Sequence, residues 1–271
     1  MLEALQHEFM QRALLAGLLA SIACGVIGTY VVVKRIVFIS GGISHASLGG
    51  VGLAVFLGIP PLLGAVVFSL LSAVIIGLAS DQRRQEEDTL IGTIWSVGMA
   101  VGIIFLSASR GYTVDPATYL FGNINWVSSG DVYTILLLDA LILATVWMLY
   151  KEFLAITLDE EFAQLRGLPV QLLYLILLCL VALTVVVMIQ VVGIILVIAL
   201  LTIPPAIGRW FTSRLHIMML LSCLLGAAFI VVGIFVSFQT DWPSGASIVL
   251  TSATAYAVVG GFRHLRLKIQ G

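Results

Sequence analysis

The chain has 271 residues, of which 61% are hydrophobic and only 10% are charged, and its net charge is −1 at pH 7. Soluble domains contain about 45–50% apolar residues, so this composition, with a mean hydropathy of +1.15, excludes a soluble protein and indicates a polytopic membrane protein. The near-zero net charge gives no reason to expect nucleic acid as a partner. The apolar runs lack the alternation of a β-barrel, so we expect an all-α transmembrane bundle embedded in the lipid bilayer.

Runs with at most one charged residue, each long enough to cross a hydrocarbon core of about 30 Å, predict the membrane-spanning helices. In chain order they are 13–33, two within 36–80 that separate at Ile59-Pro60-Pro61, 89–109, 132–150, two within 170–208 with Gln190 and Gly193 at their corner, 216–240 and 242–262. Residues 1–271 are therefore predicted to form one transmembrane domain of nine helices, or eight if one segment is re-entrant.

Polar connections at 81–88 and 110–131 and a charged segment at 151–167 separate these runs. Lys and Arg are favoured on the cytoplasmic side of a membrane. With nine helices and a cytoplasmic C-terminus, eleven of the thirteen Lys and Arg residues fall inside, and only Arg12 and Arg110 fall outside. This asymmetry predicts an extracytoplasmic N-terminus and places the charged segment in the cytoplasm, where ATP is.

The second predicted helix is rich in small residues and contains one histidine, His45. On a helix, three glycines share a face with this histidine: Gly41, Gly49 and Gly52. Small residues allow helices to approach closely, but an ionisable group in the membrane is costly unless it serves a path or finds a partner. Imidazole is also a good ligand for Zn²⁺, Fe²⁺ and Mn²⁺. Two interpretations of His45 stay open: a metal ligand or gate, and a hydrogen-bonded packing residue.

Three aspartates are further candidates for a cation path. Asp139 lies within the fifth predicted span, where an unpaired carboxylate costs about 2.5–3.5 kcal/mol on insertion scales, so we expect it to face protein or water. Asp115 and Asp241 fall on the predicted extracytoplasmic side, where they would attract an incoming cation or bind a delivery protein; as alternatives, both are cap or turn residues. Pro204 and Pro205 predict a helix break beside the path, with freed carbonyls that meet water or the ion.

The charged segment contains a short, helix-compatible stretch. Glu161, Ala163 and Gly167 are spaced as in the Glu-Ala-Ala-x-x-x-Gly loop by which membrane subunits of ABC importers contact their ATPase, and the stretch resembles that loop, with Phe162 in place of one alanine. Acidic residues suit the start of a helix and Gly167 its end. We therefore predict, within a coupling loop at 151–169, a short helix over 159–166 that acts as a lever. The alternative is a solvated loop that merely connects two spans.

The chain contains no Gly-x-x-x-x-Gly-Lys-Ser/Thr sequence, so it has no P-loop with which to hold ATP phosphates. If ATP drives the protein, the ATPase is a separate polypeptide, and this chain is expected not to be an enzyme.

Five segments, taken in order, resemble the permeases of zinc, manganese and iron ABC importers. They are Ile43-Ser44-His45-Ala46; Val114-Asp115-Pro116 followed by Tyr119-Leu120-Phe121-Gly122-Asn123; the loop with Glu161, Ala163 and Gly167; Val192-Gly193 through to Ala199-Leu200-Leu201-Thr202-Ile203-Pro204-Pro205-Ala206; and Asp241-x-Pro243-Ser244-Gly245. Each motif alone is modest, but together they cover nearly the whole chain in register.

The resemblance implies an importer permease in the plasma (inner) membrane of a prokaryote, paired with a second permease copy that is identical or different. It further implies two cytoplasmic ABC ATPases that bind ATP, and an extracytoplasmic binding protein that delivers a divalent metal ion; no cofactor is bound by this chain. Ser44 and His45 are then expected on the metal path, with His45 as a metal ligand and Asp139, Asp115 and Asp241 as candidate oxygen donors.

One position departs from the family. Many members resemble Asp-Ala-x-Ser-His-Ala in the second span, whereas Gly41 stands here at the position of the aspartate. Fewer charged ligands weaken the hold on a hard ion such as Mn²⁺, which leaves the choice among zinc, manganese and iron open.

Two alternative functions also stay open. A permease for a metal chelate, such as a siderophore or haem, would have a wide, uncharged cavity without a protein ligand, which the glycine at position 41 allows. The other is a non-ABC ion-coupled carrier or membrane enzyme, although neither a His-Glu-x-x-His nor a Gly-x-Ser-x-Gly sequence with suitable partners is present.

Overall fold

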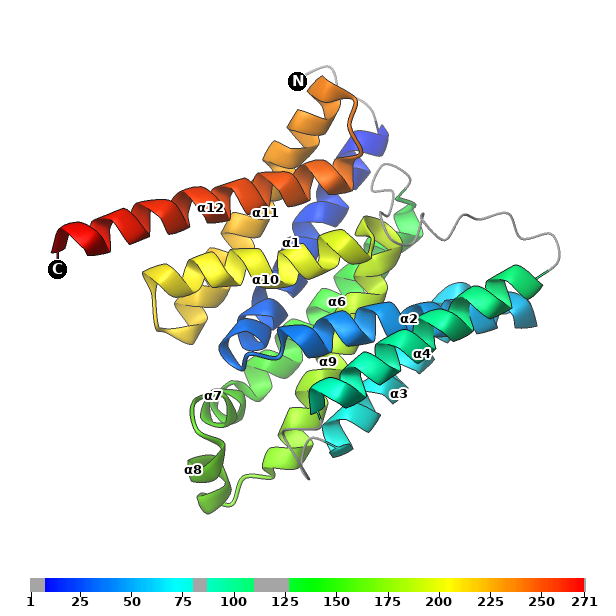
Figure 1. Ribbon diagram of the computed structural model, residues 1–271, viewed down its shortest axis with the longest axis horizontal. Coiled ribbons are helices and arrows are strands. Elements are labelled where there is room, and N and C mark those ends of the chain that lie inside the picture. The colour runs from blue at the N-terminus through cyan, green and yellow to red at the C-terminus, as the bar shows by residue number, and fades with distance from the viewer. Residues whose placement is uncertain (1–7, 80–86, 110–126, 271) are drawn as a thin grey trace.

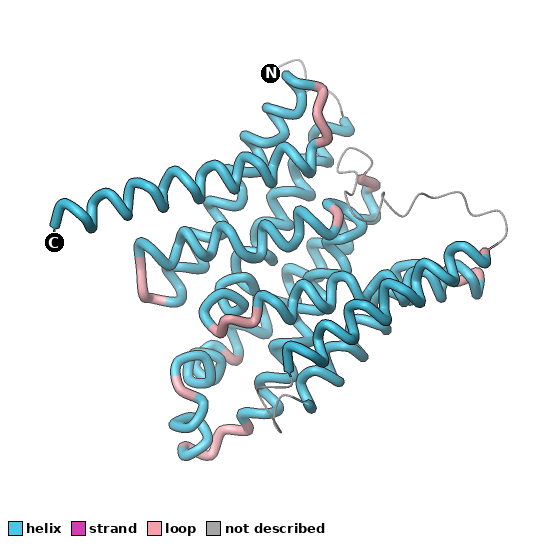
Figure 2. The backbone as a smooth tube through the Cα atoms, in the orientation of Figure 1, coloured by secondary structure: helices cyan, strands magenta, loops and turns pink. Residues whose placement is uncertain are grey.

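The computed structural model describes residues 8–79, 87–109 and 127–270, and Figures 1 and 2 show them as a bundle of helices. No strand occurs within these residues. Nine of the described helices are long and apolar enough to cross a membrane. The predicted all-α class and the predicted number of nine spans are therefore confirmed for the described part of the chain.

The helices begin and end close to the predicted limits. The first five spans are α1 (Glu8–Val33), α2 (Val37–Leu57), α3 (Pro61–Ala79), α4 (Glu87–Ala108) and α6 (Ser129–Met148). Two shorter helices follow, α7 (Tyr150–Leu158) and α8 (Glu160–Leu165), and the last four spans are α9 (Val170–Val192), α10 (Ile194–Phe211), α11 (Leu215–Thr240) and α12 (Ser244–Gln270). The predicted polar connections are 81–88 and 110–131, and most of both lies in the ranges 80–86 and 110–126, which are outside the described residues.

Glycines with positive φ form two of the turns that separate successive spans. Gly58, with φ of 71°, ends α2 in the left-handed conformation, and Pro61 then starts α3. Gly193, with φ of 80°, lies between α9 and α10 at the predicted corner. A residue without Cβ adopts such dihedrals readily, so the turns follow directly from the sequence.

The spans pack in two neighbourhoods that share α9. In the first, α2 lies between α4 and α3; in the second, α1 contacts α11, α10 and α6 (Figure 1). Helix α9 contacts α3 and α2 on one side and α1, α10 and α6 on the other. Among the described spans, α4 and α12 are the least buried, with 22% and 17% of an apolar 18-residue stretch buried in each. Their exposed apolar side chains are suited to lipid.

The expected helix break at Pro204 and Pro205 is wrong, because α10 continues through both prolines and both are buried. Pro205 has no N–H for the carbonyl of Leu201, four residues earlier. This carbonyl faces α1 at Gly28, where a Cβ would lie only 2.3 Å from the Leu201 oxygen. The freed oxygen is therefore covered by the backbone of α1. Packing against the surrounding helices allows α10 to remain helical through the prolines.

Candidate functional site

The ring of His45 lies against α4. It stacks on the ring of Trp95 with a centroid distance of 4.2 Å and an interplanar angle of 8°. The Nδ1 atom of His45 is buried and has no hydrogen-bond partner among the described residues. The packing interpretation expected a hydrogen bond to the ring, and Nδ1 makes none among the described residues. A buried polar atom without a partner is uncommon. In the tautomer that carries its proton on Nε2, this nitrogen can accept a proton or a metal ion.

At two of the three glycines that share a face with His45, the neighbouring helix fills the space where a side chain would lie. A Cβ at Gly49 would lie 2.8 Å from the oxygen of Gly98, and a Cβ at Gly52 would lie 2.3 Å from the oxygen of Gly102. The backbones of α2 and α4 therefore touch at these positions, as small residues allow. At Gly41, by contrast, the nearest atom to a Cβ would be Cζ3 of Trp95 at 3.8 Å, which is ordinary contact. Space for a side chain beside His45 exists at Gly41.

Ser44 is fully buried in α2, next to His45. Its Oγ donates a hydrogen bond to the carbonyl of Ser40 at 2.7 Å, and Ser47 donates to the carbonyl of Ser44 at 2.6 Å. The hydroxyl proton of Ser44 is thus used within the helix, and its oxygen retains lone pairs that can accept.

Asp139 lies in the other neighbourhood, on α6, with 3% of its surface exposed. Neither carboxylate oxygen has a hydrogen-bond partner of good geometry among the described residues, although the backbone of Ala23 is near. Cys24 on α1 and Cys223 on α11 lie near Asp139. Because α6 packs on α1 and α9 while α2 packs on α4 and α3, the structure does not bring Asp139 and His45 together.

Of the two remaining aspartates, the structure describes Asp241. Asp115 lies outside the described residues. Asp241 is exposed and caps the C-terminus of α11 in the left-handed conformation, with φ of 56°. No group of three or more His, Cys, Asp or Glu side chains that could hold a metal ion occurs in the described part of the chain.

The predicted short helix is present as α8. Asp159 caps its N-terminus, because its Oδ1 accepts from the N–H of Phe162 at 2.9 Å, and Gly167 ends it with φ of 78°. Ala163 is fully buried, whereas Phe162 and Leu165 are 50% and 87% exposed. Of the three residues in the coupling motif, Ala163 faces the bundle and Glu161 and Gly167 lie at the surface. The exposed face of α8 therefore carries two large apolar side chains.

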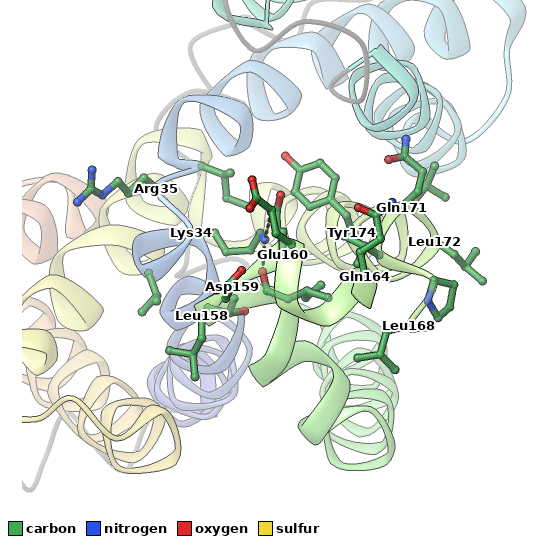
Figure 3. A pocket seen from close by; sticks show the side chains of 18 of the residues that line it. Lys34, Arg35, Leu158, Asp159, Glu160, Gln164, Leu168, Gln171, Leu172 and Tyr174 are labelled. Carbon is green, nitrogen blue, oxygen red and sulfur yellow. Dashed lines mark hydrogen bonds and ion pairs between the residues drawn. The ribbon is translucent and has the colours of Figure 1, made fainter. Parts of the chain in front are cut away.

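Lys34 is a site residue that the sequence did not single out. It follows α1 directly, and its Nζ forms an ion pair with Glu160 of α8 at 2.6 Å (Figure 3). A cavity of about 1110 Å³ lies beside the pair and is also lined by Arg35, Gln171 and Tyr174. A lysine at the end of a span indicates which side of the membrane that end faces. The residues around Lys34 give no sign that it pairs with Glu160, which lies far away in the sequence.

Known proteins match this chain over nearly its whole length, including both groups of packed spans and α8. Residues 6–262 match the family model described as the ABC 3 transport family. An uncharacterized membrane protein of Synechocystis sp. is 46% identical over 263 residues, which cover 97% of this chain and 94% of that protein. The manganese transport system membrane protein MntC of Halalkalibacterium halodurans is 36% identical over 256 residues, which cover 94% and 88% of the two chains.

Among solved structures, PsaBC from Streptococcus pneumoniae in complex with a Fab is similar over the whole fold. The TM-score is 0.87, the sequence identity is 33%, and the alignment covers 98% of this chain and 98% of that one. The arrangement of the nine described spans is therefore shared with a protein whose structure has been solved.

Proposed function

Because this chain belongs to the ABC 3 transport family, we propose that it carries a divalent first-row transition metal ion into the cell across the plasma membrane of a prokaryote. The chain is the membrane permease subunit of a metal transport system, and ATP is hydrolysed by a separate chain. The alternative of a non-ABC carrier or membrane enzyme is set aside by the family. The metal ion that the chain carries and the subunits with which it assembles are part of this proposal.

The metal path passes His45. This proposal is supported by the buried Nδ1 atom of His45, which has no hydrogen-bond partner among the described residues. Neutral imidazole nitrogen is a common ligand of Zn²⁺, Fe²⁺ and Mn²⁺. The oxygen of Ser44 lies in the same helix and is a second candidate donor. Asp139 is buried on α6, which packs on α1 and α9 away from His45, so we assign the ligand role to His45.

The end of the bundle that carries α8 faces the cytoplasm, and α8 contacts the ATPase through its exposed apolar residues. Support comes from the spacing of Glu161, Ala163 and Gly167 and from the burial of Ala163, which leaves the opposite face of the helix free for a partner. The opposite end, with Asp241 between α11 and α12, faces the extracytoplasmic binding protein, and Asp115 and Asp241 attract the cation there. Two permease copies and two ATPases complete the importer.

Uptake by the reconstituted importer tests the proposal. The complex in vesicles, with ATP and the binding protein, is given Mn²⁺, Fe²⁺ and Zn²⁺ in turn, and uptake is measured per folded complex. We expect His45→Ala to lower uptake by about tenfold or more, the loss typical of damaged metal sites, without changing metal binding to the isolated binding protein. His264→Ala, at an exposed position in α12, is the matched control and should transport normally.

Two outcomes contradict the proposal. Unchanged uptake in His45→Ala removes this residue from the path. Uptake of a siderophore or haem complex by the wild-type importer, without uptake of the free ions, favours the metal-chelate alternative instead.

A further inference from the structure

The side chain of Lys34 is almost completely enclosed although it carries a full positive charge, with 5% of its surface exposed. Its Nζ donates to Oε1 of Glu160 at 2.6 Å and to the carbonyl of Ile156 at 2.8 Å. Nζ also lies 5.3 Å from the centre of the Tyr174 ring, where an aromatic face attracts a cation. A buried ammonium is stable only when its N–H groups are paired. The positions of Lys34 and its partners therefore depend on one another.

The two hydrogen-bond acceptors define the corner between α7 and α8. Ile156 lies in the last turn of α7, where carbonyl groups have no donor within the helix and a cation is favourable. Glu160 is the first residue of α8. Figure 3 shows Glu160 and Tyr174 of α9 near Lys34, with Arg35 pointing away. One ammonium group thus holds the end of one helix and the start of the next.

The backbone of Lys34 is itself held by hydrogen bonds. Its N–H donates to the carbonyl of Tyr30 at 2.9 Å, and the N–H of Ile36 donates to the carbonyl of Val31 at 2.9 Å. Arg35 between them has φ of 61°, so α1 ends in a left-handed cap. Lys34 is therefore attached to α1 by a closed turn and moves with that helix.

Helix α1 is in turn packed tightly against the bundle. A Cβ at Gly25 would lie 2.6 Å from Sγ of Cys223 on α11, and a Cβ at Gly28 would lie 2.3 Å from the oxygen of Leu201 on α10. Close-packed contacts of this kind change between discrete arrangements and do not deform smoothly. A displacement of α1 is therefore passed to α10 and α11.

We propose that Lys34 is a positioning residue that transmits the movement of α8 to α1 and from there to the spans packed on it. This inference rests on the proposed function, in which the exposed face of α8 contacts the ATPase. The ion pair lies on the inner side of α8, where Ala163 is fully buried, and the exposed Phe162 and Leu165 lie on the outer side. A force applied from outside reaches α1 through Lys34.

The variant Lys34→Met tests this role, because it keeps the apolar stem and removes the ammonium group. In the reconstituted importer we expect metal uptake per ATP hydrolysed to fall by about fivefold or more, the lower end of typical coupling between sites, while ATP hydrolysis continues. Amide hydrogen exchange of residues 156–168 should become faster. Arg214→Met, at an exposed position just before α11 and outside the coupling loop, is the control and should change neither quantity.

A charge exchange separates transmission from simple structural support. Lys34→Glu alone should uncouple, and Lys34→Glu combined with Glu160→Lys should recover part of the uptake per ATP. If Lys34→Met does not assemble, Glu160→Gln replaces it, because that variant keeps an acceptor oxygen and should show a smaller loss. A purely structural role predicts less folded complex with an unchanged ratio of uptake to ATP hydrolysis.

The inference is overturned if the wild-type importer transports metal and Lys34→Met changes neither the uptake per ATP nor the exchange of residues 156–168. If the wild-type complex imports no metal, the proposed function fails instead. The exchange experiment on the same complex then still decides whether Lys34 holds α8, because it does not depend on transport.

Discussion

At the scale of single residues, the surroundings of His45 are set by its neighbours on α2 and α4. The stack on Trp95 holds the imidazole in one plane, 8° from parallel. Nε1 of Trp95 donates to Sδ of Met99 at 3.1 Å, which fixes the indole in turn. The contacts with α4 therefore fix the orientation of the ring, as the proposed ligand role of His45 requires.

A carboxylate introduced at Gly41 should alter the choice of metal. Gly41 is one turn before His45, so the two side chains are neighbours on the helix, and a Cβ at this position meets nothing closer than 3.8 Å. A charged oxygen favours harder ions. We expect Gly41→Asp to raise the preference for Mn²⁺ over Zn²⁺ about fivefold, or about 1 kcal/mol, measured as uptake of each ion by the importer in vesicles.

The matched control for this change is Gly41→Asn, which has nearly the same shape and no charge. It should keep the wild-type preference. An equal shift in both variants would trace the effect to side-chain volume and contradict the role given to charge.

Asp139 shows why an isolated charged residue is a poor guide to function. An unpaired carboxylate in lipid has a high free-energy cost. This cost indicates that Asp139 faces protein, but it does not indicate what Asp139 does there. The structure places it between α1 and α6, beside Ala23 and Cys24, in the neighbourhood that does not contain His45. The same sequence observation therefore fits a path residue and a packed residue equally well.

At the scale of elements, the contact between α1 and α10 explains how a helix tolerates two prolines. Pro205 removes the donor for the Leu201 carbonyl, and the backbone of Gly28 covers that oxygen. A Cα–H group that approaches so closely gives a weak hydrogen bond to the carbonyl. Thr202 donates back to the carbonyl of Ile198 at 2.8 Å. These contacts keep α10 helical through the two prolines.

Gly28→Ala should destabilise the protein, because the new methyl group would lie 2.3 Å from a backbone oxygen that cannot move freely. We expect a loss of about 1–3 kcal/mol, as for other overpacked cores, seen as a lower melting temperature of the purified protein in detergent. Gly92→Ala, where a Cβ would meet nothing within 4 Å, is the control and should melt no lower than wild type. Equal melting temperatures for the two variants would contradict the close contact.

The end of α8 offers a second test at this scale. Gly167 has φ of 78° and no atom within 4 Å of a Cβ, so a large side chain would be strained and would project outward, toward the proposed ATPase. Gly167→Trp should insert normally in the membrane and lose the coupling between ATP hydrolysis and uptake. Gly167→Asn is the control, since asparagine tolerates this conformation. Normal uptake and normal stimulation of the ATPase in Gly167→Trp would rule out a lever at this position.

At the scale of the whole molecule, the start of α1 and the turn between α11 and α12 lie at the end of the bundle opposite α8 (Figure 1). This arrangement makes the orientation testable with two exposed positions, Leu165 at 87% and Trp242 at 55% exposure. A membrane-impermeant thiol reagent should label Trp242→Cys in intact cells and Leu165→Cys only in inverted vesicles.

The wild-type chain is the control for this labelling, since its cysteines 24, 179 and 223 are buried or partly buried within spans. The reverse pattern would place α8 outside the cell and exclude contact with a cytoplasmic ATPase.

The sequence by itself determined the class, the number of described spans and their limits. Charge-free runs such as 216–240 and turns such as Gly193 are local properties, because lipid requires each segment to satisfy its own backbone. The short helix α8 was also predictable, since Asp159 and Gly167 are local start and stop signals. The five ordered motifs were enough to indicate the family, which the comparisons confirm.

Only the tertiary structure decided which helices touch. The partners Lys34 and Glu160 are 126 residues apart, and Gly28 meets Leu201 through a backbone approach that no local pattern describes. The structure also separated Asp139 from His45, and it distinguished Gly41, which has free space, from Gly49 and Gly52, which do not. Helical periodicity gives the face of one helix, but the identity of the neighbour depends on close packing among all the spans at once.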